Sequence, residues 1–157
     1  MSKTVKPIPD GFHSMNPYFV VPRAAEALEF YAKALGAEEL YRMEGPGGSI
    51  MHAEMRIGDS VLMLADENPD QGALAPSTLG GSPVNILMYV EDVDTGYRRA
   101  IDAGAKEVMP PVDMFWGDRY GKFTDPFGHN WSIATHTEDV EPEEMNKRAQ
   151  EVFAQQT

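Results

Sequence analysis

The same order of predicted elements, β-α-β-β-β, occurs twice along the chain, and this repeat constrains the fold more than any other feature. In the first copy an alternating strand, His13–Val21, leads into a helix from about Arg23 to Leu35, whose apolar residues recur at helical spacing. Gly36 then suits the left-handed conformation in which many helices end. Three more strands are predicted after it, with a hairpin turn at Gly58-Asp59: Ala37–Met43, Ile50–Ile57 and Ser60–Ala65.

The second copy follows the same plan. The strand Val84–Val90 precedes Asp92, a predicted N-cap, and a helix that places Val93, Tyr97, Ala100 and Ile101 on one face and ends at Gly104. Strands are predicted at Lys106–Met109, Tyr120–Thr124 and Asn130–Thr135. Residues 34–37 and 102–105 align with a shift of 102 − 34 = 68 residues. We therefore expect two βαβββ modules of similar structure.

The pattern predicts one domain over residues 1–157, with modules at 12–66 and 83–137. Residues 67–82 are rich in Pro, Gly, Ser and Asn and are interpreted as a linker. Residues 138–157 form a tail with a helix predicted at Pro142–Gln156, capped by Asp139 or Glu141. This helix would pack on the body or on a second chain through an apolar stripe, Met145, Ala149, Val152 and Phe153.

Charge and cysteine content exclude several classes of function. The 13 Lys and Arg against 25 Asp and Glu give a net charge of −12, and no basic stripe exists that could hold a phosphate backbone. The absence of cysteine excludes disulfides, thiolate metal sites and cysteine nucleophiles. No apolar run approaches the roughly 20 residues of a membrane span, and the first residues lack the apolar core of a signal peptide. We expect a soluble cytoplasmic protein with neither nucleic acid nor membrane as a partner.

The two modules, together with five short segments, resemble the vicinal oxygen chelate superfamily, which includes glyoxalase I, bleomycin resistance proteins and extradiol dioxygenases. The resemblance covers roughly residues 12–137, and within the superfamily it is greatest to the PhnB-like branch. It implies an α+β fold in which the modules form a curved, cupped mixed sheet with helices outside. The segments that carry it are Pro17–Val21, Ala27–Tyr31, His52–Met55, Trp116–Gly121 and Asp125–Trp131.

In that superfamily each module supplies one metal ligand from its first strand, usually His or Gln, and one from its fourth, usually Glu. Alignment of the modules places these positions at Asn16 and Met63 in the first and at Asn85 and Ser132 in the second. The spacing is the same for both pairs, 85 − 16 = 69 and 132 − 63 = 69. A thioether, two amides and a hydroxyl offer no charge to balance a divalent cation. We expect no metal and no cofactor at this site.

Strand alternation places His52, Glu54 and Arg56 on one face, with Met51, Ala53, Met55 and Ile57 toward the helices. His52 is a candidate general acid or base, with Glu54 as its partner. The alternative is an ion-paired, partly solvated strand face without a function. His13 and His136, at strand ends, are expected to be solvated.

The segment Met114–Gly121 holds three aromatic residues, together with Asp118 and Arg119. Such a loop caps an apolar ligand, or it is a structural hairpin whose Trp116 closes one end of the cup. The predicted ligand pocket contains Asn16, Tyr18, His52, Arg56, Met63, Asn85, Tyr89, Trp116, Arg119, Tyr120 and Ser132.

Three functions remain open. The first is a metal-free protein that binds a small apolar or aromatic molecule. The second is a metal-dependent lyase, isomerase or dioxygenase with a relocated metal site at His52 and Glu54. The third is a structural protein whose own side chains fill the cavity. We also expect a homodimer, because open curved sheets need their edges covered.

Overall fold

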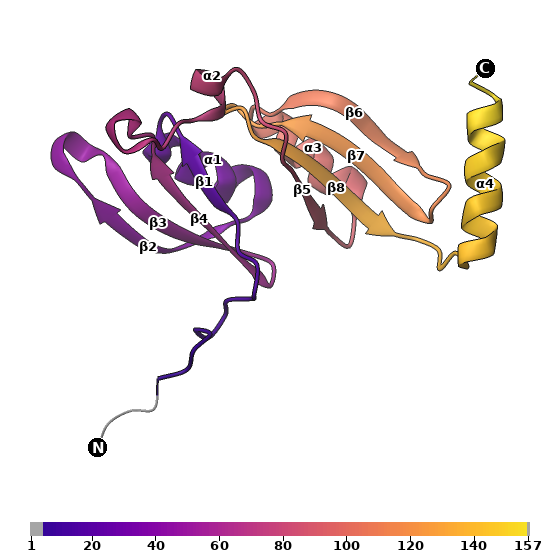
Figure 1. Ribbon diagram of the computed structural model, residues 1–157, viewed down its shortest axis with the longest axis horizontal. Coiled ribbons are helices and arrows are strands. Elements are labelled where there is room, and N and C mark those ends of the chain that lie inside the picture. The colour runs from indigo at the N-terminus through magenta and orange to yellow at the C-terminus, as the bar shows by residue number, and fades with distance from the viewer. Residues whose placement is uncertain (1–4, 157) are drawn as a thin grey trace. The chain divides into compact units, whose positions relative to one another are not determined.

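The computed structural model describes residues 5–156 and contains two compact units, one up to Ser82 and one from Pro83 onward (Figure 1). Each unit is built on one βαβββ module, so the predicted α+β class and both modules are confirmed. Among the described residues no helix has the length and apolar character needed to cross a membrane.

The sheet of the first unit has the order β1-β4-β3-β2, with β1 parallel to β4 and the other pairs antiparallel. Helix α1 packs on one face, and short helical turns lie in the connections. The elements are β1 (Tyr18–Val21), α1 (Ala24–Leu35), β2 (Glu38–Glu44), η1 (Pro46–Gly48), β3 (Ile50–Ile57), β4 (Ser60–Asp66), η2 (Pro69–Gln71) and α2 (Pro76–Leu79).

The second unit repeats this topology as β5-β8-β7-β6, with β5 parallel to β8, and adds a C-terminal helix. Its elements are β5 (Asn85–Tyr89), α3 (Val93–Ala103), β6 (Lys106–Asp113), β7 (Asp118–Thr124), β8 (Asn130–His136) and α4 (Pro142–Ala154).

The backbone registers confirm the repeat at the level of single residues. Tyr18 pairs with Met63 in the first sheet and Leu87 with Ser132 in the second, so both strands carry the same offset, 87 − 18 = 69 and 132 − 63 = 69. The helix starts are held alike. Asp66 Oδ1 accepts from the amide of Ala24 at 2.6 Å, and the equivalent Thr135 Oγ1 accepts from the amide of Val93 at 2.9 Å.

The core of each unit lies between the helix and one face of the sheet. Burial of these large apolar side chains provides most of the stabilisation, on the order of 1.5–3 kcal/mol for each. In the second unit the turn into β8 is held by Asp125, whose carboxylate accepts from the amides of Phe127 and His129 and from Trp131 Nε1. The largest buried side chains are Leu28, Tyr31, Ile50, Met55 and Leu64 in the first unit and Phe123 and Ile133 in the second.

The end of α1 and the start of α3 agree with the sequence prediction, and the predicted cap of α4 is wrong. Gly36 has φ 67°, in the left-handed region, and Asp92 accepts from the amide of Thr95 at 3.1 Å as the N-cap of α3. Glu141 precedes α4 but makes no capping hydrogen bond, and Asp139 bonds His136 instead.

Several strand boundaries differ from the prediction. The first strand begins at Tyr18, not at His13, because the preceding residues form a turn. Strand β6 continues to Asp113 through Pro110 and Pro111, which an edge strand with irregular register tolerates.

The predicted face of Met51 is wrong, since its side chain is 59% exposed and the neighbouring Ile50 is buried. An irregular register between β2 and β3, at Met43 and Glu44, interrupts the alternation there. Beyond this irregularity Ala53 and Met55 face the helix side, as predicted.

Candidate functional site

The face of the first sheet opposite α1, here called the first open face, carries a chain of three polar side chains. Tyr18 Oη lies 2.9 Å from His52 Nδ1, and His52 Nε2 lies 3.2 Å from Glu54 Oε1. A neutral imidazole satisfies both contacts when it donates from Nε2 to Glu54 and accepts from the Tyr18 hydroxyl. Partial burial raises the pKa of Tyr18, so the hydroxyl keeps its proton at neutral pH.

The remaining residues predicted on this face are divided between its centre and its edge. Met63 pairs with Tyr18 on one side and with Glu54 on the other, so it lies at the centre, half-buried. Arg56 is exposed and bonds Glu38 at 2.6 Å, away from His52. Asn16 lies before β1, where its amide group bonds the backbone of His13 in both directions.

The second open face, opposite α3, holds a different polar group centred on Ser132. This serine is fully buried. Its Oγ accepts from Asn85 Nδ2 at 2.7 Å and lies 2.5 Å from Tyr120 Oη. Lys122 pairs across the strands with Ser132, and its Nζ lies 5.9 Å from the centre of the Tyr120 ring. Sequence reasoning missed Lys122, although its alternation with Tyr120 identifies the same face.

A second cluster on this unit surrounds Asp118, which is only 5% exposed. Its Oδ2 accepts from Tyr89 Oη at 2.9 Å and from Trp116 Nε1 at 3.1 Å, and its Oδ1 lies 2.8 Å from His136 Nδ1. His136 Nε2 bonds Asp139 at 2.8 Å. His136 is thus tied to two carboxylates, whereas the sequence suggested a solvated side chain.

The protonation of this cluster follows from its contacts. Burial disfavours ionisation of Asp118, but the hydrogen bonds from His136, Tyr89 and Trp116 outweigh it and lower its pKa. The hydrogen bonds of His136 to Asp139 and Asp118 raise the pKa of the imidazole. The hydrogen bond to Asp118 also raises the pKa of Tyr89. The cluster is therefore an ionised carboxylate with a neutral phenol and an imidazole that favours its protonated form.

Arg119 lies on the opposite side of β7 from Tyr120. Its guanidinium bonds Asp94 of α3 at 2.7 and 2.9 Å and Asp113 at 3.2 Å. These ion pairs tie β7 to the helix and occupy the guanidinium of Arg119, which the sequence analysis placed in the ligand pocket.

The four positions that correspond to metal ligands do not suit a divalent cation. The amide of Asn16 is used by its own turn, Met63 offers only a thioether, and Asn85 and Ser132 bond each other. Within residues 5–156 no three His, Asp or Glu side chains lie together as metal ligands would. Neither pair offers the anionic or imidazole donors that structural and catalytic metal sites use.

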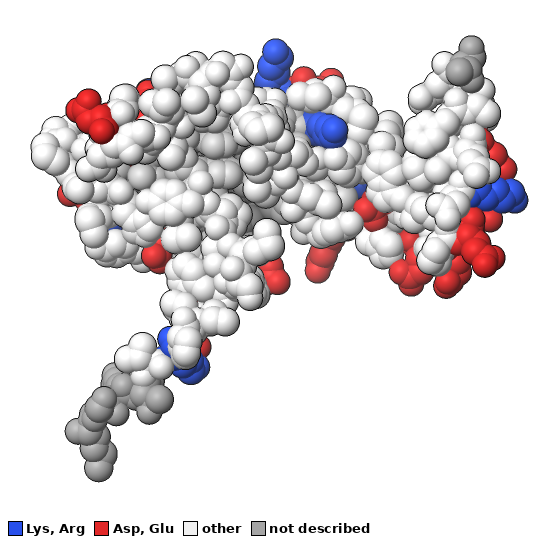
Figure 2. All heavy atoms as spheres, viewed as in Figure 1, with Lys and Arg blue, Asp and Glu red and all other residues white. Residues whose placement is uncertain are grey.

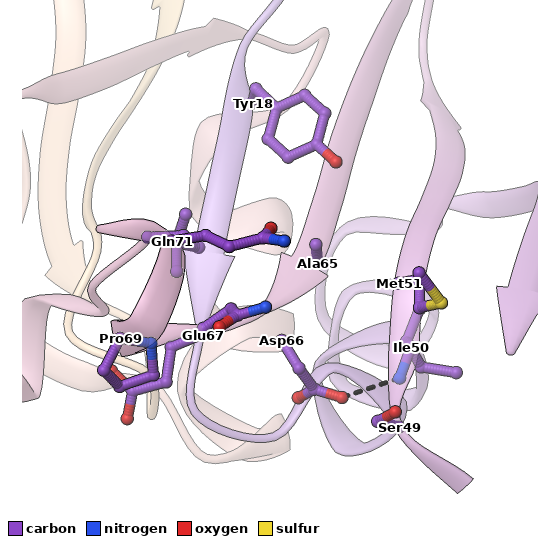
Figure 3. A pocket seen from close by; sticks show the side chains of 12 residues that line it. Tyr18, Ser49, Ile50, Met51, Ala65, Asp66, Glu67, Pro69 and Gln71 are labelled. Atoms are coloured by element: carbon purple, nitrogen blue, oxygen red, sulfur yellow. Dashed lines mark hydrogen bonds between the residues drawn. The ribbon is translucent and has the colours of Figure 1, made fainter. Parts of the chain in front are cut away.

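Each unit also contains a hollow that the sequence did not indicate. The first, of about 340 Å³, lies at the end of β1 and β4 and is walled by residues 67–73, a segment interpreted as a plain linker (Figure 3). The second, of about 270 Å³, is lined by Asn85, Lys122, Thr124 and Asn130 among others. Loop residues that follow a strand can form such walls without any sequence motif, so only tertiary structure identifies them.

Comparison with curated proteins finds relatives over most of the chain. An uncharacterised protein of Mycobacterium tuberculosis is 43% identical over 135 residues, which span 84% of this chain and 79% of the relative. The protein YjdN of Escherichia coli is 28% identical over 142 residues, spanning 76% of this chain and 92% of YjdN.

Solved structures share the fold. TioX from Micromonospora is 26% identical, with a TM-score of 0.65 over 79% of this chain and 98% of TioX. A PhnB protein from Bacillus cereus, 14% identical with a TM-score of 0.60 over 78% of this chain and 99% of its own, shows likeness of fold alone. The family model of the Glyoxalase/Bleomycin resistance protein/Dioxygenase superfamily matches residues 12–133. Both βαβββ modules lie almost wholly within that match, and the chain belongs to this superfamily.

Proposed function

We propose that the protein binds a small apolar or aromatic molecule on its open sheet faces, without a metal ion at the positions that hold one in metal-dependent members of the superfamily. One observation carries the proposal: the side chains at the ligand positions of the second module, Asn85 and Ser132, bond each other and Tyr120. Ser132 Oγ, which accepts from Asn85 Nδ2 and also bonds Tyr120, would have to give up one of these hydrogen bonds to coordinate a cation.

The apolar character of the ligand is inferred from the side chains that these faces expose. Water-exposed tyrosines, methionines and leucines on a sheet face are typical of surfaces that bind other molecules. Strand pairing places all of them on the same side as the polar clusters. They are Tyr18 (49% exposed), Tyr41 (47%), Met43 (44%), Leu87 (45%) and Tyr89 (58%).

On the first open face the proposed binding residues are Tyr18, His52 and Met63. On the second open face, taken by itself, they are Asn85, Tyr89, Tyr120 and Ser132. On the first open face the Tyr18 hydroxyl and the imidazole supply hydrogen bonds that orient a ligand, while the rings supply contact area. Trp116 Nε1 donates to Asp118, and the Trp116 ring meets the Tyr120 ring edge-on, with 5.6 Å between the ring centres. That Trp116 covers a bound ligand stays a prediction.

Native mass spectrometry and elemental analysis of protein purified without chelator test the metal prediction. We expect no stoichiometric zinc, nickel, manganese or iron after dialysis against metal-free buffer. Near-stoichiometric metal would contradict the proposal. Its loss in His52→Ala would then favour the metal-dependent enzyme, with a relocated site at His52 and Glu54.

A thermal-shift panel of small molecules tests ligand binding itself. A ligand at 100 times its Kd stabilises the folded state by about 2.7 kcal/mol, which gives a clear rise in Tm. A panel in which no small aromatic molecule raises the Tm would favour a structural role.

We also propose that the protein is located in the cytoplasm. A fluorescent fusion protein found outside that compartment would contradict this.

We also propose a homodimer in which α4 packs on a second copy. A helix of 13 residues is marginal on its own in water, yet no residue of α4 is buried, and Phe153 is 63% exposed. The start of the helix is acidic (Figure 2), and its position is fixed by Arg148, which bonds Glu138 at 2.8 and 2.9 Å. Met145, Ala149 and Val152 of the apolar stripe are half-buried and Phe153 is exposed, so a second copy could cover the rest of the stripe.

Light scattering at micromolar concentration is expected to give the mass of a dimer. Deletion of residues 140–157 is expected to give either a monomeric mass or newly exposed apolar surface, which dye binding detects. A monomeric mass for the full chain would contradict the dimer. An unchanged dimer after the deletion would show that α4 has no part in it.

A further inference from the structure

The hollow of the second unit, here called the β5/β7 pocket, lies on the second open face at the end where β5 and β8 begin. Asn130 pairs with Asn85 on one side and with Thr124 on the other, and Lys122 lies two residues before Thr124 on the same face. Val108 of the edge strand β6, 57% exposed, adds an apolar wall. All of these residues belong to paired strands, so a ligand would meet a formed site and would not have to order a loop.

The ammonium of Lys122 lies on this face as well. It lies over the ring of Tyr120, 5.9 Å from the ring centre, and Tyr120 Oη lies 2.5 Å from Ser132 Oγ. Ser132 Oγ in turn accepts from Nδ2 of Asn85, which lines the pocket, at 2.7 Å. This series of contacts joins the ammonium to the wall of the pocket through side chains of one face.

The positive charge at this end of the face has no carboxylate to balance it. The residues that line the pocket, all of which are described, include no acidic one. Within residues 5–156 neither Lys122 nor Lys106, which pairs with Thr124 on the same face, forms an ion pair. Glu107 accepts from Tyr97 of α3 and so lies on the helix side. Because salt screens exposed charges beyond about 8 Å, the two lysines outweigh the net charge of −12 at this point.

The first module has the opposite charge at the equivalent position. Lys122 pairs with Ser132, and Glu54 pairs with the equivalent Met63 (132 − 63 = 69). The carboxylate of Glu54 has a partner within its own module, since its Oε1 lies 3.2 Å from His52 Nε2. In the second module a lysine takes the place of this carboxylate and has no counterion within the described chain. An anion from outside the chain would supply one.

We infer that the β5/β7 pocket binds the carboxylate group of a small aromatic acid. The carboxylate would accept hydrogen bonds from the Lys122 ammonium and from the side-chain amide of Asn85. An asparagine amide has two hydrogens, and within residues 5–156 Asn85 Nδ2 donates to Ser132 alone. This inference rests on the proposed small-molecule function and specifies the charge of its ligand.

The size of the pocket suits one end of such a ligand. Its volume of about 270 Å³ lies just below the roughly 300–1,000 Å³ of sites that enclose a whole small molecule. The carboxylate and the carbons next to it would occupy the pocket. The aromatic body would extend along the open face over Leu87 and Tyr89, the next two residues of β5 on this side, which are 45% and 58% exposed.

Three probes of similar size and different charge test it: 3-phenylpropanoate, 3-phenylpropanamide and 3-phenylpropylammonium. Titration of the full ¹⁵N-labelled chain, followed by NMR, is expected to shift the backbone amides of Leu87, Lys122 and Asn130 and the side-chain amide of Asn85. We expect the carboxylate to bind about tenfold more tightly than the neutral amide, and the ammonium to bind most weakly. Added salt should weaken binding of the carboxylate and leave that of the neutral amide unchanged.

Lys122→Gln removes the charge and keeps a polar side chain at an exposed position, so the fold is not disturbed. It is expected to weaken binding of the carboxylate about tenfold and to leave that of the neutral amide unchanged. Lys147→Gln is the matched control, because Lys147 is exposed on α4, which follows the far end of β8, and does not line the pocket. It makes the same change in net charge and should alter affinity by about twofold or less.

Each other outcome overturns the inference. Equal affinities for the three probes, with shifts at the same amides, would remove the charge preference while small-molecule binding stands. Equal effects of Lys122→Gln and Lys147→Gln would assign the preference to net charge alone. No shift of the pocket amides at millimolar probe would show that the pocket binds no such acid, and the thermal-shift panel would still decide the broader function.

Discussion

Asp118→Ala is expected to lower the free energy of unfolding by about 3 kcal/mol. The substitution removes the acceptor of Tyr89, Trp116 and His136 at one buried point. The indole, the phenol and the imidazole are partly exposed and would bond water in its place, so the expected cost is the loss of three hydrogen bonds to an ionised carboxylate, each worth about 1.5–3 kcal/mol at most. Urea denaturation followed by tryptophan fluorescence measures the change.

Asp113→Asn is the matched control, since Asp113 is 80% exposed in its side chain and has a single ion pair, with Arg119. It should change the free energy of unfolding by about 0.5 kcal/mol or less. A loss as small for Asp118→Ala as for Asp113→Asn would contradict the view that Asp118 organises this part of the second unit.

The same cluster predicts a pH dependence. The folded-state pKa of His136 lies above its ordinary value of 6.5, so its contribution is complete below pH 6.5 and is lost as pH rises through the raised pKa. The pKa of Asp118 is lowered from 3.8, so its contribution is complete above pH 3.8 and is lost as pH falls through the lowered value. The pair therefore stabilises most between these limits. Asp118→Asn, which keeps the shape, is expected to flatten the decline above pH 6.5, and an unchanged profile would contradict this assignment.

Gly117→Ala is expected to destabilise by about 3 kcal/mol or more. Gly117 has φ 97°, and an added Cβ would overlap the carbonyl oxygen of Glu138 and press on Val140. The overlap arises because Gly117 O accepts from the amides of Thr137 at 2.9 Å and Glu138 at 3.0 Å, which holds the two segments together. The change in Tm measured by calorimetry gives the result.

Gly104→Ala separates backbone strain from steric overlap. Gly104 also has positive φ, 121°, but an added Cβ there meets no atom within 4 Å. It should cost about 1 kcal/mol from conformation alone. Equal losses for the two variants would show that the contact between Gly117 and Glu138 carries no special weight.

The sequence predicted the parts of the fold that depend on local patterns. Helical spacing, Gly36 and Asp92 located α1 and α3, because caps and periodicity act over a few residues. The prediction failed where the register becomes irregular, as at Met51, since a bulge depends on the partner strand. The sequence also did not show that Arg119, which it placed in the ligand pocket, bonds Asp94 and Asp113.

For the candidate site too, the sequence predicted the contacts that depend on local patterns and missed those that depend on tertiary structure. Alternation placed His52 and Glu54 on one face, the resemblance to the superfamily placed Asn85 and Ser132 at one site, and the structure joins both pairs by hydrogen bonds. It could not show that His136 meets Asp118, which is 18 residues away, or that Glu67 lines a pocket. The sequence by itself determined the repeat and the faces of most strands, because these follow from periods of 2 and 3.6 residues, and its short segments indicated the family by resemblance. Only the tertiary structure decided which charged side chains form ion pairs and which do not, because burial and pairing depend on residues brought together from distant strands.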